Sequence, residues 1–144
     1  MVREDMLGNV GSEVRAAGAG EFLYRATMAN AVVTAACGVV AIGGANTWVR
    51  AFALREAWLP YALGALYVGF GGLLALTAAR RRPLEATAIT AMDAGYGVAS
   101  VAAIALFPGA MNGAGREAVL FVAALVAGLV AAQSVGIARV RRAG

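Results

Sequence analysis

The chain has 144 residues, of which 61% are hydrophobic, with a mean hydropathy of +0.75 and a formal net charge of +4. This composition is more apolar than that of a typical soluble domain, and the length allows one domain. A single cysteine excludes an intrachain disulfide. The absence of histidine removes the usual ligand of zinc, copper and haem iron, so we expect no metal and no other cofactor.

Residues 1–21 are predicted to form a polar, partly helical, cytoplasmic N-terminal tail ahead of a membrane domain at 22–144. This segment mixes four acidic residues with Arg3 and Arg15 and contains no apolar core. A secretory signal peptide needs such a core, so we do not expect one here.

Four apolar stretches fill most of the remaining chain. They are Ala26–Ala45, Leu59–Ala79, Ala86–Phe107 and Glu117–Ala138. A bilayer crossing takes about 20 helical residues, and each stretch is long enough. Helices of a soluble bundle would keep a polar stripe, whereas these stretches are apolar on every face. The sequence therefore predicts an all-α integral membrane protein, an antiparallel bundle of four transmembrane helices surrounded by membrane lipids.

The arginines indicate the orientation of this bundle. Nine lie before the first stretch, between the second and third, and after the fourth: Arg3, Arg15, Arg25, Arg80, Arg81, Arg82, Arg139, Arg141 and Arg142. The opposite side holds three, Arg50, Arg55 and Arg116. This asymmetry predicts a multi-pass protein with both termini cytoplasmic. Arginine without lysine, with abundant alanine and glycine, suggests a bacterial source and hence the inner membrane. Because topology explains the basic charge, we expect no nucleic-acid partner.

The longest connection, Asn46–Trp58, carries three aromatic side chains among charged residues: Trp48, Phe52 and Trp58. Aromatic rings favour the headgroup level, so we predict a short amphipathic segment on the non-cytoplasmic face. Two interpretations stay open, an anchoring loop and a docking surface for a partner.

The other connections are shorter. Arg80–Glu85 contains Pro83 and predicts an antiparallel hairpin of the second and third stretches, while Pro108–Arg116 is glycine-rich and predicts a flexible turn. Helices in lipid associate where small residues permit close packing. Ridges of such residues occur at Ala91, Gly95, Ala99 and Ala103 and at Ala124, Gly128, Ala132 and Gly136. They predict a close contact between the third and fourth stretches.

A few polar residues interrupt the apolar stretches. Asn30, Thr77, Asp93 and Gln133 all fall in the predicted cytoplasmic half of the bilayer. A polar group facing hydrocarbon without a partner costs a few kcal/mol, so we predict that they form one layer across the bundle, with Tyr96 nearby.

Asp93 carries the sharpest functional hypothesis, because an intramembrane carboxylate is a candidate functional group by default. We expect it to accept a hydrogen bond from Asn30, Gln133 or Tyr96, or to pair with Arg25 or Arg139. Three roles remain open: a buried clasp that fixes helix register, a group that carries protons or binds a cation, and an interfacial carboxylate that reaches water.

No arrangement typical of catalysis accompanies these residues. Cys37, Ser100 and Ser134 have no histidine base to activate them, and the GFGG run at 69–72 lies inside an apolar stretch. We therefore expect a protein that is not an enzyme.

Several short runs carry a family resemblance: Ala29-Asn30, Ala78-Ala79-Arg80-Arg81, Met92-Asp93-Ala94-Gly95-Tyr96 and Ala132-Gln133-Ser134-Val135-Gly136. Over residues 22–140 the chain resembles a widespread group of small four-helix bacterial integral membrane proteins of unknown function. Those proteins often have Trp where this chain has Tyr96. The resemblance implies no activity, but it implies that Asn30, Asp93 and Gln133 are one recurring polar set.

These observations favour a non-catalytic accessory or structural subunit of a larger membrane complex, respiratory or photosynthetic, with other integral membrane subunits as partners. The alternative is a small oligomeric transporter or channel with Asp93 as coupling carboxylate. A membrane enzyme or a protein that binds quinone or lipid ranks last, because no catalytic set is present.

Overall fold

The computed structural model describes the backbone of residues 2–143 and, within that range, all side chains except those at 2–13, 15 and 83. Five helices make up this part of the chain: α1 (Val2–Gly43), α2 (Ala45–Ala51), α3 (Leu59–Arg80), α4 (Pro83–Leu106) and α5 (Gly113–Ala143). All but the short α2 contain a segment long and apolar enough to cross a membrane. The predicted fold class, an all-α bundle of four membrane-spanning helices, is confirmed.

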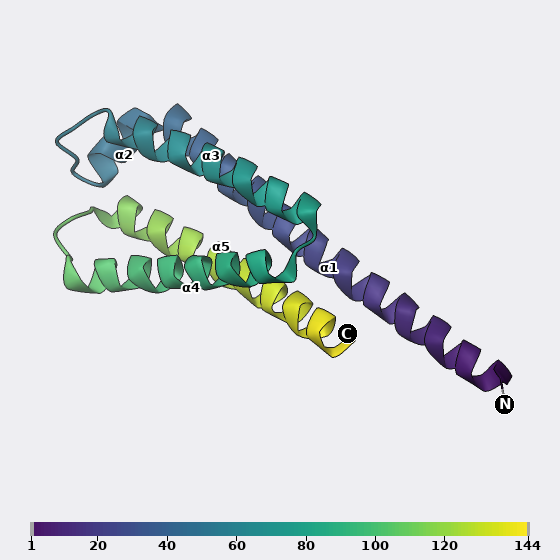
Figure 1. Ribbon diagram of the computed structural model, residues 1–144. Helices are drawn as coiled ribbons and strands as arrows, with labels where there is room; N and C mark the ends of the chain where they lie inside the picture. Colours follow the sequence, from purple (N-terminus) through teal and green to yellow (C-terminus); the bar gives the residue numbers. More distant parts are fainter. Residues whose placement is uncertain (1, 144) are drawn as a thin grey trace.

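Helix α1 is longer than the predicted first span. Its described backbone is one helix of 42 residues from Val2, so the segment expected to be a partly helical tail continues directly into the span. The apolar part, Ala16–Gly43, begins ten residues before the predicted Ala26. The N-terminal end of α1 projects past the other helices (Figure 1). The side chains of Arg3 and Arg15, two of the predicted cytoplasmic markers, lie outside the described residues.

The spanning helices alternate in direction and pack as two pairs (Figure 1). Helix α1 packs on α3, α4 packs on α5, and the pairs meet mainly where α1 contacts α5. Helices α3 and α4 contact each other only sparsely, so the expected hairpin has its tight turn but little packing between its two helices.

The turn between α3 and α4 consists of two arginines. Arg81 adopts a left-handed conformation with φ 53° and donates its backbone N–H to the Ala78 carbonyl at 3.1 Å. Arg82 is extended, as expected for a residue before proline, and Pro83 lies in the first turn of α4. A turn this short fixes where α4 begins but leaves the two helices free to diverge.

Three glycines bring α1 and α3 into backbone contact. A Cβ added at Gly38 would lie 2.6 Å from the Gly64 carbonyl oxygen, and one at Gly64 would lie 2.7 Å from the Gly38 carbonyl oxygen. A Cβ added at Gly71 would lie 2.8 Å from the Ala31 carbonyl oxygen. Side chains do not fit at these distances, so glycine is required at these positions. We call this contact between α1 and α3 the glycine seam.

The predicted ridge-to-ridge contact between α4 and α5 is wrong in its residues, although the two helices do pack. An added Cβ at Gly95 or Gly128 would meet no atom within 4 Å, and Gly136 packs against Leu23 of α1. The face of α4 that turns inward carries Thr90 and Asp93, and residues three or four apart share a face. Gly95 is two residues from Asp93 and therefore points elsewhere.

At the opposite end of the bundle, the α4–α5 connection is tied to α2. The Asn112 backbone N–H donates to the Ala51 carbonyl at 2.9 Å, and the Asn112 side chain accepts from the Gly115 N–H at 3.0 Å, capping α5. A Cβ at Gly115 would lie 2.7 Å from the Ala51 carbonyl oxygen. This glycine-rich segment, which we expected to be flexible, is thus held by α2.

Candidate functional site

Each membrane-spanning helix contributes a buried polar side chain. Thr27 and Asn30 come from α1, Thr77 from α3, Thr90 from α4 and Gln133 from α5, and each is at most 7% exposed. In lipid a buried polar group needs a partner inside the protein, and Thr27 finds one within its own helix, at the Leu23 carbonyl, 3.0 Å away. Three of these residues belong to the predicted polar layer, and Thr27 and Thr90 are additions to it.

Asn30 and Asp93 form a direct contact between α1 and α4. The Asn30 Nδ2 donates to the Asp93 carboxylate at 2.5 Å, and the Asn30 Oδ1 accepts from the Thr34 hydroxyl at 3.2 Å. Both ends of the buried amide are therefore used, and the carboxylate is held on one side. Of the partners expected for Asp93, the structure selects Asn30.

Gln133 contacts α4 one turn before Asp93. Its Oε1 lies 3.1 Å from the Thr90 hydroxyl, which is also 2.8 Å from the Ala86 carbonyl of its own helix, so the two oxygens share one donor. The Gln133 side chain is completely buried, and its Nε2 has no hydrogen-bond partner among the described residues. A bond from Gln133 to Asp93, one of the alternatives that we expected, is not made. Thr90 is instead the α4 residue that links α5 to the polar layer.

Tyr96 bonds to α3 rather than to Asp93. Its hydroxyl lies 2.5 Å from the Tyr67 hydroxyl, one donating to the other, and the rings are edge to face with centroids 6.3 Å apart. This pair bridges the two helices that otherwise contact each other only sparsely. The prediction that Tyr96 lies near Asp93 holds, because both line one cavity.

That cavity, of about 190 Å³, lies among the four spanning helices and is partly open. Most of its lining is apolar, from Val33, Phe70, Met92 and four aliphatic residues of α5. The polar contributions come from Asn30, Thr34, Asp93 and the two tyrosines, and Cys37 also lines it. The cavity therefore combines one carboxylate, a few hydroxyl and amide groups, and a large apolar wall, which is the composition of a small-molecule site.

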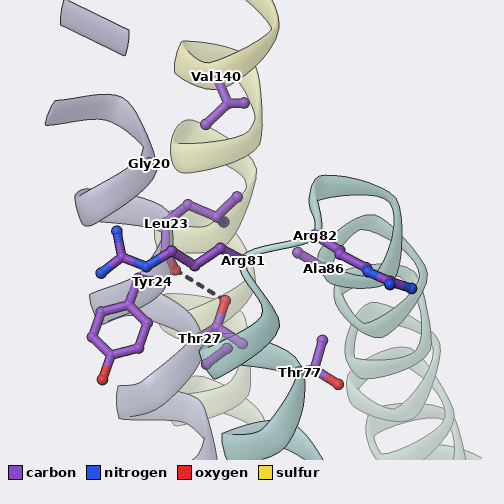
Figure 2. Close-up of a pocket in the computed structure, with 10 residues that line it drawn as sticks. Gly20, Leu23, Tyr24, Thr27, Thr77, Arg81, Arg82, Ala86 and Val140 are labelled. Carbon is purple, nitrogen blue, oxygen red and sulfur yellow. Dashed lines mark hydrogen bonds between the residues drawn. The ribbon is translucent and has the colours of Figure 1, made fainter. Parts of the chain in front are cut away.

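The arginine-rich end of the bundle holds a second, smaller cavity of about 60 Å³ (Figure 2). Figure 2 shows Arg81 lying beside Tyr24, with its guanidinium carbon 4.9 Å from the ring centroid. Arg81 also pairs with Glu21 at 3.1 Å, and Arg82 pairs with Glu85 at 3.2 Å. These contacts are largely exposed, so each contributes little to the free energy of unfolding.

Neither arginine expected beside Asp93 reaches it. Arg25 pairs with Glu21 at 3.0 Å, four residues earlier on α1, and Arg139 stacks on the Phe22 ring at 4.6 Å. Long arginine side chains reach the aqueous boundary from a helix end, where their charge stays solvated. Asp93 is thus left without an ion pair within the described part of the chain.

The predicted aromatic anchors lie in and after α2. Trp48 donates from its Nε1 to the Val40 carbonyl at 3.2 Å, and its ring lies 6.1 Å from that of Phe52. Trp58 precedes α3 and is 59% exposed. Trp48 therefore lies against the end of α1, whereas Trp58 is available to the membrane interface or a partner.

The polar residues that sequence reasoning missed are Thr27, Thr34, Tyr67 and Thr90. Thr34 is four residues after Asn30 and Thr90 three before Asp93, so each shares a helix face with a residue that we had identified. Helical spacing was therefore a usable signal for both. Tyr67 had a weaker signal, a phenol inside an apolar stretch, which needs a partner when buried.

Among the described residues, no group of three cysteine or acidic side chains is placed to hold a metal ion. A scan of protein-family models and searches of curated proteins and of solved structures find no match to this chain. The resemblance to small four-helix bacterial membrane proteins therefore stays a prediction. What the geometry offers chemically is a carboxylate at the edge of an apolar cavity, able to accept hydrogen bonds and to balance a positive charge.

Proposed function

We propose that the protein is a non-catalytic accessory or structural subunit of a larger assembly in the bacterial inner membrane, such as a respiratory or photosynthetic complex. One observation carries this proposal: residues suited to close helix packing face away from the chain's own bundle. Ala91, Gly95 and Ala99 of α4 are exposed, as are Ala124 and Gly128 of α5.

These positions matter because of how helices associate in lipid. Without a hydrophobic driving force between them, helices gain from close van der Waals contact, which glycine and alanine allow. The chain uses glycine in this way between α1 and α3, where an added Cβ would clash with backbone atoms. Gly95 and Gly128 have no such neighbour. A helix of another subunit is the partner that these surfaces fit.

The proposal is tested by isolating the tagged chain from its own membranes in a mild detergent and identifying co-purifying chains by mass spectrometry. We expect a stoichiometric set of other integral membrane proteins. Gly95→Leu and Gly128→Leu should lose that set while the isolated chain keeps its helical content and elution volume. Gly72→Leu, which adds the same side chain at an exposed glycine of α3, outside the α4 and α5 surfaces, is the matched control and should keep the partners. A clean homo-oligomer from wild-type membranes would contradict the proposal.

A second candidate is a small oligomeric transporter or channel that uses Asp93 as coupling carboxylate. The observation that favours it is the position of Asp93, which lines a cavity shared by all four spanning helices. Reconstituted into vesicles, such a protein would carry a flux driven by a proton gradient, and Asp93→Asn would abolish the flux without unfolding the bundle. Flux that persists in Asp93→Asn would exclude this role for Asp93.

A further inference from the structure

The cavity around Asp93 is bordered in part by α3 and α4. Tyr67 and Phe70 of α3 line one side and Met92 and Tyr96 of α4 the other. These two helices contact each other only sparsely, and the Tyr67–Tyr96 hydrogen bond joins them across the cavity. A ligand can therefore enter between α3 and α4, from the membrane, when this pair separates.

The cavity size limits the ligand. An apolar cavity of about 150 Å³ is enough for benzene. The volume here is about 190 Å³, so the enclosed part of a ligand is one aromatic ring with a few methyl groups or an aliphatic body of similar size.

The charge in the cavity defines the ligand further. Asp93 accepts one hydrogen bond, from Asn30, and forms no ion pair with any residue that the structure describes. An ionised carboxylate in apolar surroundings is costly unless a cation balances it. None of the described side chains supplies such a cation at this site, and a ligand carrying one positive charge would.

The aromatic side chains of the cavity suit the same ligand. Tyr67, Phe70 and Tyr96 line it together with Asp93. Aromatic faces attract organic cations, quaternary ammonium groups in particular, and the attraction is larger where water is excluded. Carboxylate, aromatic rings and apolar wall thus point to one ligand class.

We propose that this cavity binds a small organic ammonium cation with an apolar body, its charged nitrogen beside Asp93 and its body against the aromatic and aliphatic lining. This goes beyond a subunit role, because none of the five residues proposed to face a partner, Ala91, Gly95, Ala99, Ala124 and Gly128, lines the cavity. Asp93 is the charge that selects the ligand, and Asn30 is the positioning residue that orients the carboxylate.

The test uses the purified full-length chain in detergent with benzyltrimethylammonium as probe and neopentylbenzene, its neutral carbon isostere, as comparison. The chain has one cysteine, Cys37, and it lines the cavity, so its reaction rate with a maleimide reports occupancy without any substitution. We expect the cation to slow this reaction at a concentration at least tenfold below that needed for the isostere. Equal protection by both compounds, or no protection by the cation, would overturn the proposal.

A variant then tests the carboxylate. Asp93→Asn should weaken benzyltrimethylammonium binding at least tenfold and leave protection by neopentylbenzene unchanged. Glu117→Gln is the matched control, because this exposed acid of α5 lies outside the cavity, and it should bind the cation as the wild type does. Wild-type affinity in Asp93→Asn would also overturn the proposal. If that variant does not fold, the comparison of the two probes on the wild-type chain decides. The assay needs no partner subunit, so its outcome is independent of the co-purification experiment.

Discussion

The seam between α1 and α3 and the seams made by α4 hold this protein together in different ways. Helix α1 meets α3 through glycines, with backbone atoms so close that no Cβ fits at Gly38, Gly64 or Gly71. Helix α4 packs on α5, and side-chain hydrogen bonds run from it to α1, α3 and α5. The glycine seam between α1 and α3 is close and continuous. The contacts made by the polar side chains of α4, here called the polar seam, border a cavity.

This difference explains why the candidate site lies where it does. Close packing leaves no room for a ligand, whereas helices held apart by polar side chains leave space between their contacts. The polar seam is also the one expected to open, because a side-chain hydrogen bond between membrane helices contributes only about 0.6 kcal/mol on average. Close packing therefore stabilises the pair of α1 and α3, and the polar side chains of α4 border the space that forms the cavity.

The largest expected effect is on the glycine seam. Gly71→Ala places a Cβ 2.8 Å from the Ala31 carbonyl oxygen, so α1 and α3 must separate, and we expect the free energy of unfolding to fall by about 2 kcal/mol. The adjacent Gly72→Ala meets no atom within 4 Å and serves as the control, with no loss of stability. Unfolding in mixed detergent micelles, followed by circular dichroism, measures both. Equal stability of the two variants would show that the seam is not close-packed.

The next effect concerns the bond between α1 and α4. In a double-mutant cycle of Asn30→Ala and Asp93→Ala, we expect a coupling of about 1 kcal/mol in the free energy of unfolding, because each residue is the other's partner between the helices. Pairing Asp93→Ala with Ser100→Ala is the control, since Ser100 bonds to the Tyr96 carbonyl within its own helix. Additive losses in the first cycle would remove Asn30 as the positioning residue for Asp93.

A smaller effect is expected where α3 and α4 are bridged. Tyr67→Phe keeps the ring and removes the hydroxyl that bonds to Tyr96. The lost hydrogen bond contributes about 0.6 kcal/mol, so the equilibrium constant for separating α3 from α4 should rise about threefold. The maleimide reaction of Cys37 should therefore become about threefold faster. Tyr61→Phe, at an exposed position near the start of the same helix, should leave the rate unchanged. A rate that Tyr67→Phe does not alter would mean that the cavity opens elsewhere.

The glycine seam and the polar seam also differ in how far the sequence could predict them. Apolar length predicted four spans, and their number is confirmed, because crossing a bilayer fixes a minimum helix length. The polar layer was accessible too, since few polar residues interrupt the spans and each needs a partner. Asn30 and Asp93 were identified on this basis, and they are bonded to each other.

The choice of packing face was not accessible in the same way. The regular ridge at Ala91, Gly95, Ala99 and Ala103 has the right spacing for close packing, yet Gly95 faces outward. Spacing says which residues share a face but not which face turns inward. On α4, Thr90 and Asp93 determine which face turns inward. An unpaired polar group facing lipid costs more free energy than a close contact at glycine would contribute. Gly64, which does contact α1, belongs to no long ridge.

The smallest change in the free energy of unfolding is expected at Gln133, which tests how α5 contributes to the polar seam. Its Oε1 accepts from Thr90, but its buried Nε2 has no partner in the described structure. Gln133→Met removes one hydrogen bond and one unpaired donor together while keeping the volume, so the two terms nearly cancel. We expect a free energy of unfolding within about 0.5 kcal/mol of the wild type. Thr90→Val removes the hydroxyl, which bonds to the Ala86 carbonyl as well as to the Gln133 Oε1, and leaves the whole amide unpaired, so it should cost about 1 kcal/mol. The order of these two variants is therefore the informative result.

A larger loss in Gln133→Met than in Thr90→Val would mean that the amide has a partner, such as a bound water, and that α5 contributes more to the polar seam than one bond to Thr90.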